Sequence, residues 1–390
     1  MAEYLHLFET EEEFQEARSD NYKEPWVSVT VENDNRVDFN KSEYEKLPET
    51  PLTFEITSNG NIKWTLYNPY NAPSTARTIE YKKNDGEWTS ITATTGGTEI
   101  GVVSGDAVQF RGNVPTFGAG GPGIGVTNCF SGSTAEFNVK GNIMSLTDSE
   151  GFSTATTLSS GYTFLAFFGG CTGLTDASQI ILPATTLANS CYQNMFQGCT
   201  NLTSAPALPA TTLAEACYQN MFSGCTSLTK APELPATTLA GHCYDSMFYG
   251  CTSLTQAPAL PATTLASYCY GSMFQNCTSL TQAPSLPATT LANYCYNGMF
   301  QSCTSLTTAP ELPATTLATY CYQNMFQGCT NLNYIKCLAK NLTAGTPPKI
   351  ATASWVSGVQ ITSGTFIKNS RAPWERGING IPDNWTAQDA

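Results

Sequence analysis

Cysteine is the residue type in this chain that could take part in the most kinds of chemistry. The 390 residues include fifteen cysteines. Twelve recur in pairs eight residues apart with a period of 26, namely Cys191/Cys199, Cys217/Cys225, Cys243/Cys251, Cys269/Cys277, Cys295/Cys303 and Cys321/Cys329. Structural zinc sites favour two to four residues between paired cysteines, so this spacing argues against a metal site. We predict that each cysteine is a small buried apolar side chain, with occasional bridges between neighbouring repeats as the alternative.

A nucleophilic cysteine needs a histidine within reach, and the chain holds only His6 and His242. His242 adjoins Cys243, but the same position of the other repeats holds Ser190, Ala216, Tyr268, Tyr294 and Tyr320. The acids of the repeats are scattered over Glu215, Glu233, Asp245 and Glu311. No carboxylate pair of the glycosidase kind is evident, which disfavours a carbohydrate-active enzyme. We predict no catalytic residues, no metal and no cofactor.

The elements that position these residues follow from the repeat. Pro-Ala-Thr-Thr-Leu-Ala begins at Pro183 and recurs every 26 residues up to Pro313. A unit of this length cannot bury a core alone, so we expect coils stacked in a solenoid with ladders of equivalent side chains inside. The predicted ladder positions of one coil are Leu213, Cys217, Met221, Phe222, Cys225, Leu228 and Leu234.

Each coil is predicted to contain two kinds of local structure. Leu-Thr-x-Ala-Pro-x-Leu-Pro reads as a short extended piece, because proline is confined to strand edges and ends. Ala-x-x-Cys-Tyr through Met-Phe, with apolar spacings of three to five, predicts a short helix. The fold class is therefore multidomain and mainly β with short helices, built around a capped solenoid of six 26-residue coils.

The regions outside the repeats have other sequence patterns. Residues 49–140 alternate as strands do, with a hairpin signal at Asn84-Asp85-Gly86 and one run from Val102 to Phe110, and predict a small Ig-like β-sandwich. Residues 141–338 form the solenoid, with 141–182 as its opening coil and 339–390 as a C-terminal cap. Residues 1–48 are an acidic N-terminal segment, with a helix expected over 10–18 and an extended piece over 24–30.

Composition excludes several classes. The net charge is −13, and residues 1–100 hold 9 of the 18 basic and 19 of the 31 acidic residues. No basic face is available for phosphates, so a nucleic-acid partner is excluded. No apolar run is long enough to span a bilayer, and the acidic start is unlike a secretory signal. We expect no membrane insertion and no Sec export.

Two resemblances follow from these residues. Phe222 to Thr229, Phe-Ser-Gly-Cys-Thr-Ser-Leu-Thr, and its copies resemble BspA-like leucine-rich repeats, although the family repeats are usually shorter. That family serves adhesion, recognition and virion roles alike. Phe8 to Phe14, Glu24 to Ser28 and Arg36 to Lys41 resemble the leader of virion-surface proteins of phages infecting gut Bacteroidales. This likeness implies that residues 1–48 dock on other virion proteins.

Variable positions of the coils are the candidate ligand contacts. Strand spacing of about 4.8 Å would align them in stripes over roughly 25–30 Å. Tyrosines recur at one register, where their rings either shield the inner layer of the coils or offer flat apolar faces to a ligand. The candidate residues are Tyr268, Tyr294, Tyr320, Lys230, Gln256, Gln282, Glu233 and Glu311.

These features together favour a non-enzymatic phage structural protein on the virion surface, of the head-fibre or decoration type. Its solenoid would bind host-surface carbohydrate or protein, and the chain could form a homo-oligomer. The alternative is a BspA-like adhesin on a bacterial cell surface.

Overall fold

The computed structural model describes residues 26–31, 35–40, 49–68, 75–119, 126–340, 342, 350–359 and 362–390. The chain forms two compact units, Met1–Pro48 and Glu49–Ala390. In the first unit, β1 (Trp26–Val31) pairs antiparallel with β2 (Asn35–Asn40). β1 covers most of the extended piece predicted over residues 24–30. The helix predicted over residues 10–18 lies outside the described residues.

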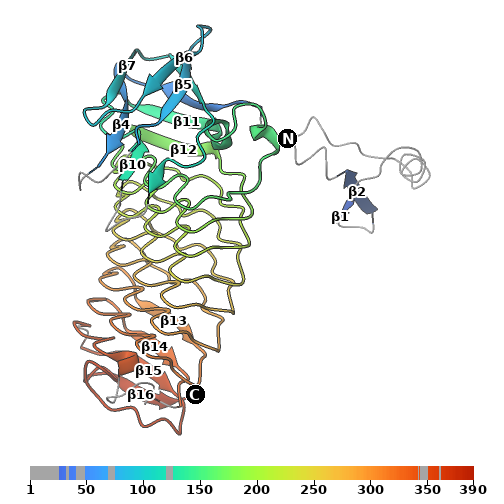
Figure 1. Cartoon of the computed structure of the whole chain (residues 1–390). Helices are drawn as coiled ribbons and strands as arrows, with labels where there is room; N and C mark the ends of the chain where they lie inside the picture. The colour runs from blue at the N-terminus through green and yellow to red at the C-terminus, as the bar shows by residue number, and fades with distance from the viewer. Residues whose placement is uncertain are drawn as a thin grey trace. The chain divides into compact units, whose positions relative to one another are not determined.

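Two sheets open the second unit, with strand orders β7-β4-β10-β9 and β12-β11-β3-β8-β5-β6 (Figure 1). Trp64 of β4 and Phe54 of β3 are both fully buried, and their rings lie 4.9 and 4.7 Å from that of Phe130. The two sheets therefore share one aromatic core. The strands are β3 (Leu52–Ile56), β4 (Gly60–Tyr67), β5 (Thr78–Lys83), β6 (Thr89–Thr92), β7 (Thr98–Val102), β8 (Ala107–Arg111), β9 (Gly118–Ala119), β10 (Val126–Cys129), β11 (Phe137–Asn142) and β12 (Leu174–Ile181).

Turn residues divide these strands. The predicted hairpin at Asn84 is present, because β5 and β6 pair antiparallel and Asn84 adopts the left-handed conformation with φ 53°. The single run predicted from Val102 to Phe110 is wrong, since it is two strands, β7 and β8. Between them, the N–H of Val103 donates to a carboxylate oxygen of Asp106 at 3.0 Å, and this turn stops the strand.

The β region continues directly into the repeats. β11 pairs in parallel with β12, placing Phe137 opposite Leu174, so the boundary expected between residues 140 and 141 falls within β11. Phe168 of the opening coil lies 5.9 Å from Phe54 on one side and 5.3 Å from Phe196 on the other. One hydrophobic core therefore runs from the sheets into the coils.

The repeats are numbered here as coil 1 (183–208), coil 2 (209–234), coil 3 (235–260), coil 4 (261–286), coil 5 (287–312) and coil 6 (313–338). The short helix predicted in each coil is wrong. In coil 2, the N–H groups of Gln219 and Met221 close turns within the coil, onto residues three earlier. Those of Asn220 and Phe222 instead bond to carbonyls of coil 3 at 2.9 Å. A helix would use every N–H internally, whereas here alternate N–H groups join the coils.

Helices are correspondingly few and short in the described residues. They are the 3-10 turns η1 (Ile143–Leu146), η2 (Phe152–Thr154) and η3 (Ile350–Thr352). The extended pieces of the coils meet mainly as single parallel bridges, such as Ser204 with Lys230 and Lys230 with Gln256. Pro206 and Pro232 nearby have no N–H to donate, which limits ladder formation there.

The interior of the coils consists of ladders, as the period predicts. The phenylalanine rings from Phe196 to Phe326 stack 5.4–5.9 Å apart. A second stack of tyrosines, from Tyr192 to Tyr322, has spacings of 5.8–6.1 Å. Of the ladder positions predicted for coil 2, all are buried except Leu213, which is partly buried.

The coils end in a parallel sheet of order β13-β14-β15-β16, comprising β13 (Thr308–Leu312), β14 (Tyr334–Cys337), β15 (Thr365–Lys368) and β16 (Thr386–Asp389) (Figure 1). Trp355 is fully buried and lies 6.3 Å from Tyr322 and 6.0 Å from Phe326. Its indole N–H donates to the carbonyl of Gly380 at 2.8 Å. Residues of the predicted C-terminal cap thus cover the ends of both aromatic ladders.

Gly224 is a position at which the free-energy cost of a left-handed backbone conformation can be measured. It has φ +75°, and a Cβ there would meet only Gly198 backbone atoms at ordinary distances of 3.6–3.7 Å. The conformation and not the space therefore opposes a side chain. We expect Gly224→Ala to lower the free energy of unfolding by about 1 kcal/mol, measured by urea denaturation. A loss above about 3 kcal/mol would show that packing is disturbed as well.

Candidate binding surface

The repeat cysteines form no reactive site in the structure. All fifteen are buried free thiols, so the bridges between neighbouring repeats considered as an alternative are absent. In the second cysteine ladder the thiol donates to the phenylalanine carbonyl of the preceding coil, as from Cys225 to Phe196 at 3.1 Å. Desolvation raises the pKa of every one of these thiols, for example to about 12 for Cys217. Buried, protonated thiols are poor nucleophiles.

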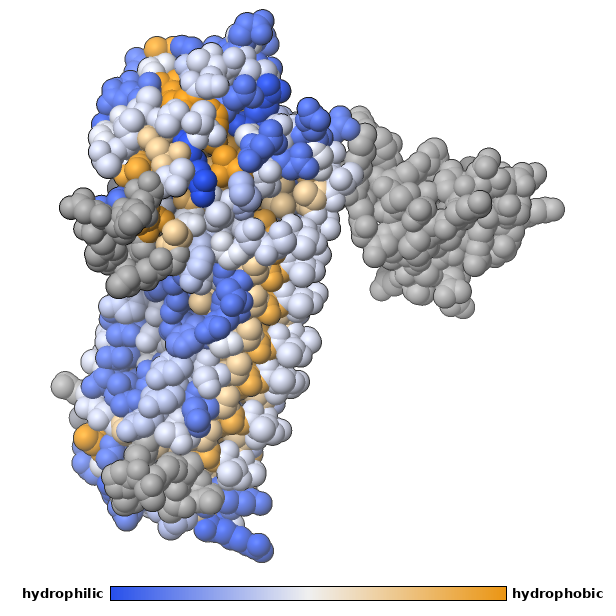
Figure 2. Space-filling model, in the orientation of Figure 1, coloured by the Kyte–Doolittle hydropathy of each residue, from blue (hydrophilic) through white to orange (hydrophobic). Residues whose placement is uncertain are grey.

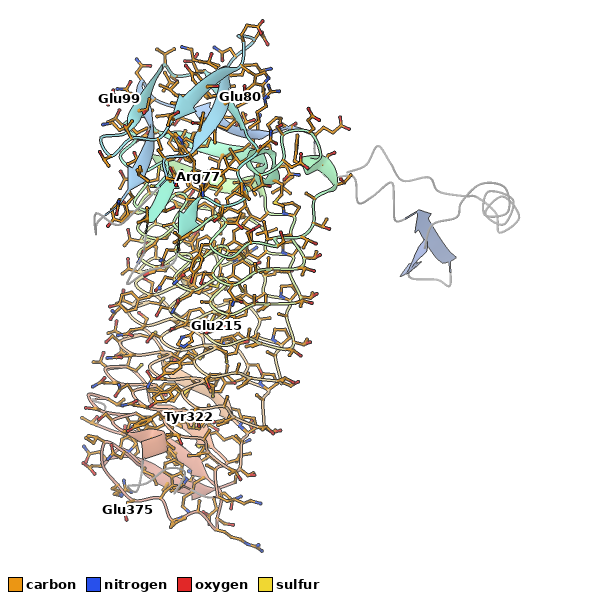
Figure 3. The ribbon with its side chains drawn as sticks, in the orientation of Figure 1. Arg77, Glu80, Glu99, Glu215, Tyr322 and Glu375 are labelled. Carbon is orange, nitrogen blue, oxygen red and sulfur yellow. The ribbon has the colours of Figure 1, made fainter. Side chains whose placement is uncertain are left out.

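The one histidine of the coils is engaged with an acid and not with a cysteine. Nδ1 of His242 lies 3.0 Å from Oδ2 of Asp245, while burial raises the pKa of the neighbouring Cys243 well above its usual value. The acids are distributed over the coils, with Glu215 (labelled in Figure 3) and Glu233 in coil 2, Asp245 in coil 3 and Glu311 in coil 5. Among the described residues, no group of three His, Cys, Asp or Glu could hold a metal ion.

The three predicted tyrosines lie in one outer aromatic row, which comprises His242, Tyr268, Tyr294 and Tyr320. Successive rings are 4.6, 4.4 and 4.8 Å apart and within 20° of parallel. All four residues are partly buried and left-handed, with φ 53–58°. The rings cover one another, so Tyr268 and Tyr294 offer no free flat face to a ligand. A ligand can reach only their edges and hydroxyl groups.

Side-chain amides run along the coils in a second ladder. Gln193 donates to Gln219 at 2.7 Å, and Gln219 donates to Asp245 at 3.0 Å. In the later coils Asn297 donates to Gln323 at 2.8 Å. These bonds between coils restrain the side chains, which stiffens the surface beside the outer aromatic row.

Three of the other predicted residues belong to a polar row on the extended pieces, which comprises Ser204, Lys230, Gln256 and Gln282. Parallel bridges join these four positions in order, so their side chains follow one another along the coils. Lys230, Gln256 and Gln282 are all exposed. The face of the coils visible in Figure 2 is mainly hydrophilic, with one narrow hydrophobic strip along the stack. Three of the predicted contact positions therefore form one exposed row along the coils.

Lys230 and Glu233 lie together at the beginning of this row. Both line a hollow of about 610 Å³, called here the Lys230 hollow. It is lined by Ser178, Thr203–Pro209, Thr229–Glu233 and Pro235. Glu311, at the position of Glu233 three coils later, is instead paired with Lys336 at 2.9 Å.

The sequence alone did not place this hollow. It combines Ser178 of β12 with extended pieces that follow 25 and 51 residues later, and their proximity depends on how the coils stack. The sequence held one indication of it, because Lys230 is the only lysine or arginine between residues 177 and 335. No helix within the described part of the chain is long and apolar enough to cross a membrane.

The chain was compared with known families, curated proteins and solved structures. Residues 166–281 and 242–346 match the model of the BspA type leucine rich repeat region, in six copies. The searches of curated proteins and of solved structures find no match. Residues 166–346 are therefore similar to BspA-type leucine-rich repeats.

Proposed function

We propose that this chain is a non-enzymatic surface protein that binds glycan or protein on a host cell through its coils. The observation that carries the proposal is the exposed polar row with the Lys230 hollow at its beginning. BspA-type repeats are typically binding or adhesion scaffolds, which agrees with this role.

The backbone of the coils supports a binding role because it is rigid. Turn bonds inside each coil and bonds between coils use alternate N–H groups, and buried aromatic stacks lie beneath them. Side chains on such a surface lose little further freedom when a ligand binds, and this preorganisation favours affinity. Sequence can therefore vary at the exposed positions while the ladders stay the same.

The site of display is proposed to be a phage virion. The support is the resemblance of residues 1–48 to virion-surface leaders, which would make this unit the contact to other virion proteins, with a homo-oligomer as one arrangement. Mass spectrometry of purified particles and of washed host-cell envelopes tests the location. We expect the chain in the particles. Its presence in the envelopes of uninfected cells alone would instead favour a bacterial adhesin.

A binding assay with the full chain tests the role of the coils. The triple variant Lys230→Ala, Gln256→Ala, Gln282→Ala removes the polar row without touching a ladder. We expect binding to host cells, measured by flow cytometry of labelled protein, to fall at least tenfold. Val103→Ser, at a 55% exposed position of the β region, is the control and should bind normally. Equal binding by the triple variant and the unmodified chain would contradict the role of this row.

A further inference from the structure

The Lys230 hollow contains the only lysine or arginine between residues 177 and 335. Lys230 is exposed and forms no ion pair or side-chain hydrogen bond with the described residues. Glu233 lies in the same hollow and is likewise unpaired there. By contrast, Lys336 is neutralised by Glu311. The hollow therefore holds one free cation and one free carboxylate.

Three kinds of surface line the hollow. Lys230 provides a positive charge, and Glu233 provides an acceptor for hydroxyl groups. Short hydroxyl side chains provide both donors and acceptors, from Ser178, Thr203, Ser204 and Thr229. The remaining wall is apolar, made by alanine, proline and one leucine of Ala205–Pro209, Ala231, Pro232 and Pro235. The volume of about 610 Å³ is within the range of small-ligand sites.

We propose that the Lys230 hollow binds an acidic saccharide, a sugar unit that carries one carboxylate. The ammonium of Lys230 meets the carboxylate, Glu233 accepts from ring hydroxyls, and the proline and alanine wall packs against the C–H face of the ring. This inference rests on the proposed function and names the ligand class of its polar row.

The charge pattern selects this class over others. A nucleic acid would need several cations to neutralise successive phosphates, and the hollow has one. A neutral sugar would leave Lys230 without a partner. A peptide with a single acidic residue satisfies the charge, but it offers few hydroxyl groups to Glu233. A saccharide with one carboxylate and several hydroxyls matches both charged groups.

The other coils provide the comparison within the chain. At the positions of Lys230 and Glu233, coil 1 has Ser204 and Ala207, coil 3 has Gln256 and Ala259, coil 4 has Gln282 and Ser285, and coil 5 has Thr308 and Glu311. Only coil 2 carries a cation together with a carboxylate. We therefore expect one acidic subsite and not a row of equivalent ones.

Titration calorimetry with the full chain tests the proposal, using tetragalacturonate, neutral tetragalactose and tetraglutamate as probes. We expect tetragalacturonate to bind most tightly. Lys230→Gln installs the residue of coils 3 and 4, so it should fold normally and lose at least tenfold in affinity for tetragalacturonate. Lys340→Gln makes the same change at an exposed lysine that does not line the hollow, so it is the matched control and should bind as the unmodified chain does. Binding of tetragalacturonate should weaken at high salt, because ions screen an exposed pair.

Three results would overturn the proposal. The first is the absence of tetragalacturonate binding by the unmodified chain, and the second is equal affinity of the Lys230→Gln variant. The third is tighter binding of tetraglutamate, which would assign the hollow to an acidic peptide. Failure here is distinguishable from failure of the proposed function. If host cells bind the unmodified chain but not the triple variant, the role of the polar row stands and only the ligand class is wrong.

Discussion

Raising the pH from 8 to about 10 in the presence of a reductant is expected to unfold the repeats. The fifteen thiols are buried and free, and desolvation holds the pKa of several, including Cys217, Cys269 and Cys277, at about 12. In the unfolded chain the same thiols ionise near pH 8.5. The measurement is the urea midpoint, followed by circular dichroism, at each pH.

The sign follows from the raised pKa values. The folded state keeps its thiols protonated, so their contribution is fully present below about pH 8.5 and is lost as the pH rises toward the folded value near 12. One unit above the unfolded pKa, each thiol costs about 1.4 kcal/mol. For the seven thiols whose pKa is raised to about 12, this is about 10 kcal/mol, comparable with the roughly 5–15 kcal/mol that usually holds a domain together.

A variant with fewer thiols separates unfolding by thiol ionisation from other effects of alkaline pH. Replacing Cys217, Cys269 and Cys277 by Ala leaves cavities and lowers stability at pH 7. The loss between pH 7 and 9.5 should nevertheless shrink by about 4 kcal/mol, because three ionising groups are gone. An unchanged pH dependence would contradict the thiol explanation. Rapid labelling of the native chain by a thiol reagent at pH 7.5 would contradict the burial itself.

Phe248→Ala is expected to lower the free energy of unfolding by about 3–5 kcal/mol. Phe248 is fully buried, and its ring lies 5.7 Å from those of Phe222 and Phe274. Removing it opens a cavity in the middle of the ladder, where the neighbouring coils are held by their bonds to each other. Because each coil contacts mainly its neighbours, the defect also weakens the coupling between the two halves of the array.

Tyr268→Ala is the matched control for that substitution. Tyr268 is also stacked between two rings, at 4.6 Å from His242 and 4.4 Å from Tyr294, but it lies on the partly buried outer row. Its loss should cost only about 1 kcal/mol. Urea denaturation of both variants measures the difference. Equal losses would mean that the outer aromatic row, and not the phenylalanine ladder, determines stability.

Several features could be predicted because they depend on a period and on residue type. Phe222 and Cys225 recur every 26 residues, so stacking of the coils must place their equivalents in line. The Asn84-Asp85-Gly86 turn is a local signal, since asparagine tolerates the left-handed conformation. The polar row was found in the same way, because Lys230, Gln256 and Gln282 share one register.

Other predictions failed where backbone partners decide the outcome. Apolar spacings of three to five, as from Cys217 to Met221, are compatible with a helix and with consecutive turns. The structure has turns, because carbonyls of the next coil accept the alternate N–H groups. The exposure of the tyrosine faces could not be predicted for a related reason. The sequence places Tyr268 and Tyr294 at one register but does not show that their rings stack on each other.

The sequence by itself determined the period, the buried ladders, the sparse charge of the coils and the exposed polar row. Only the tertiary structure decided which N–H groups join the coils, which aromatic faces are covered, and that Ser178, Lys230 and Glu233 line one hollow. The physical reason is the same in each case. Periodicity specifies which residues are equivalent, whereas contacts between residues 26 or more positions apart depend on the angle and spacing at which the coils stack.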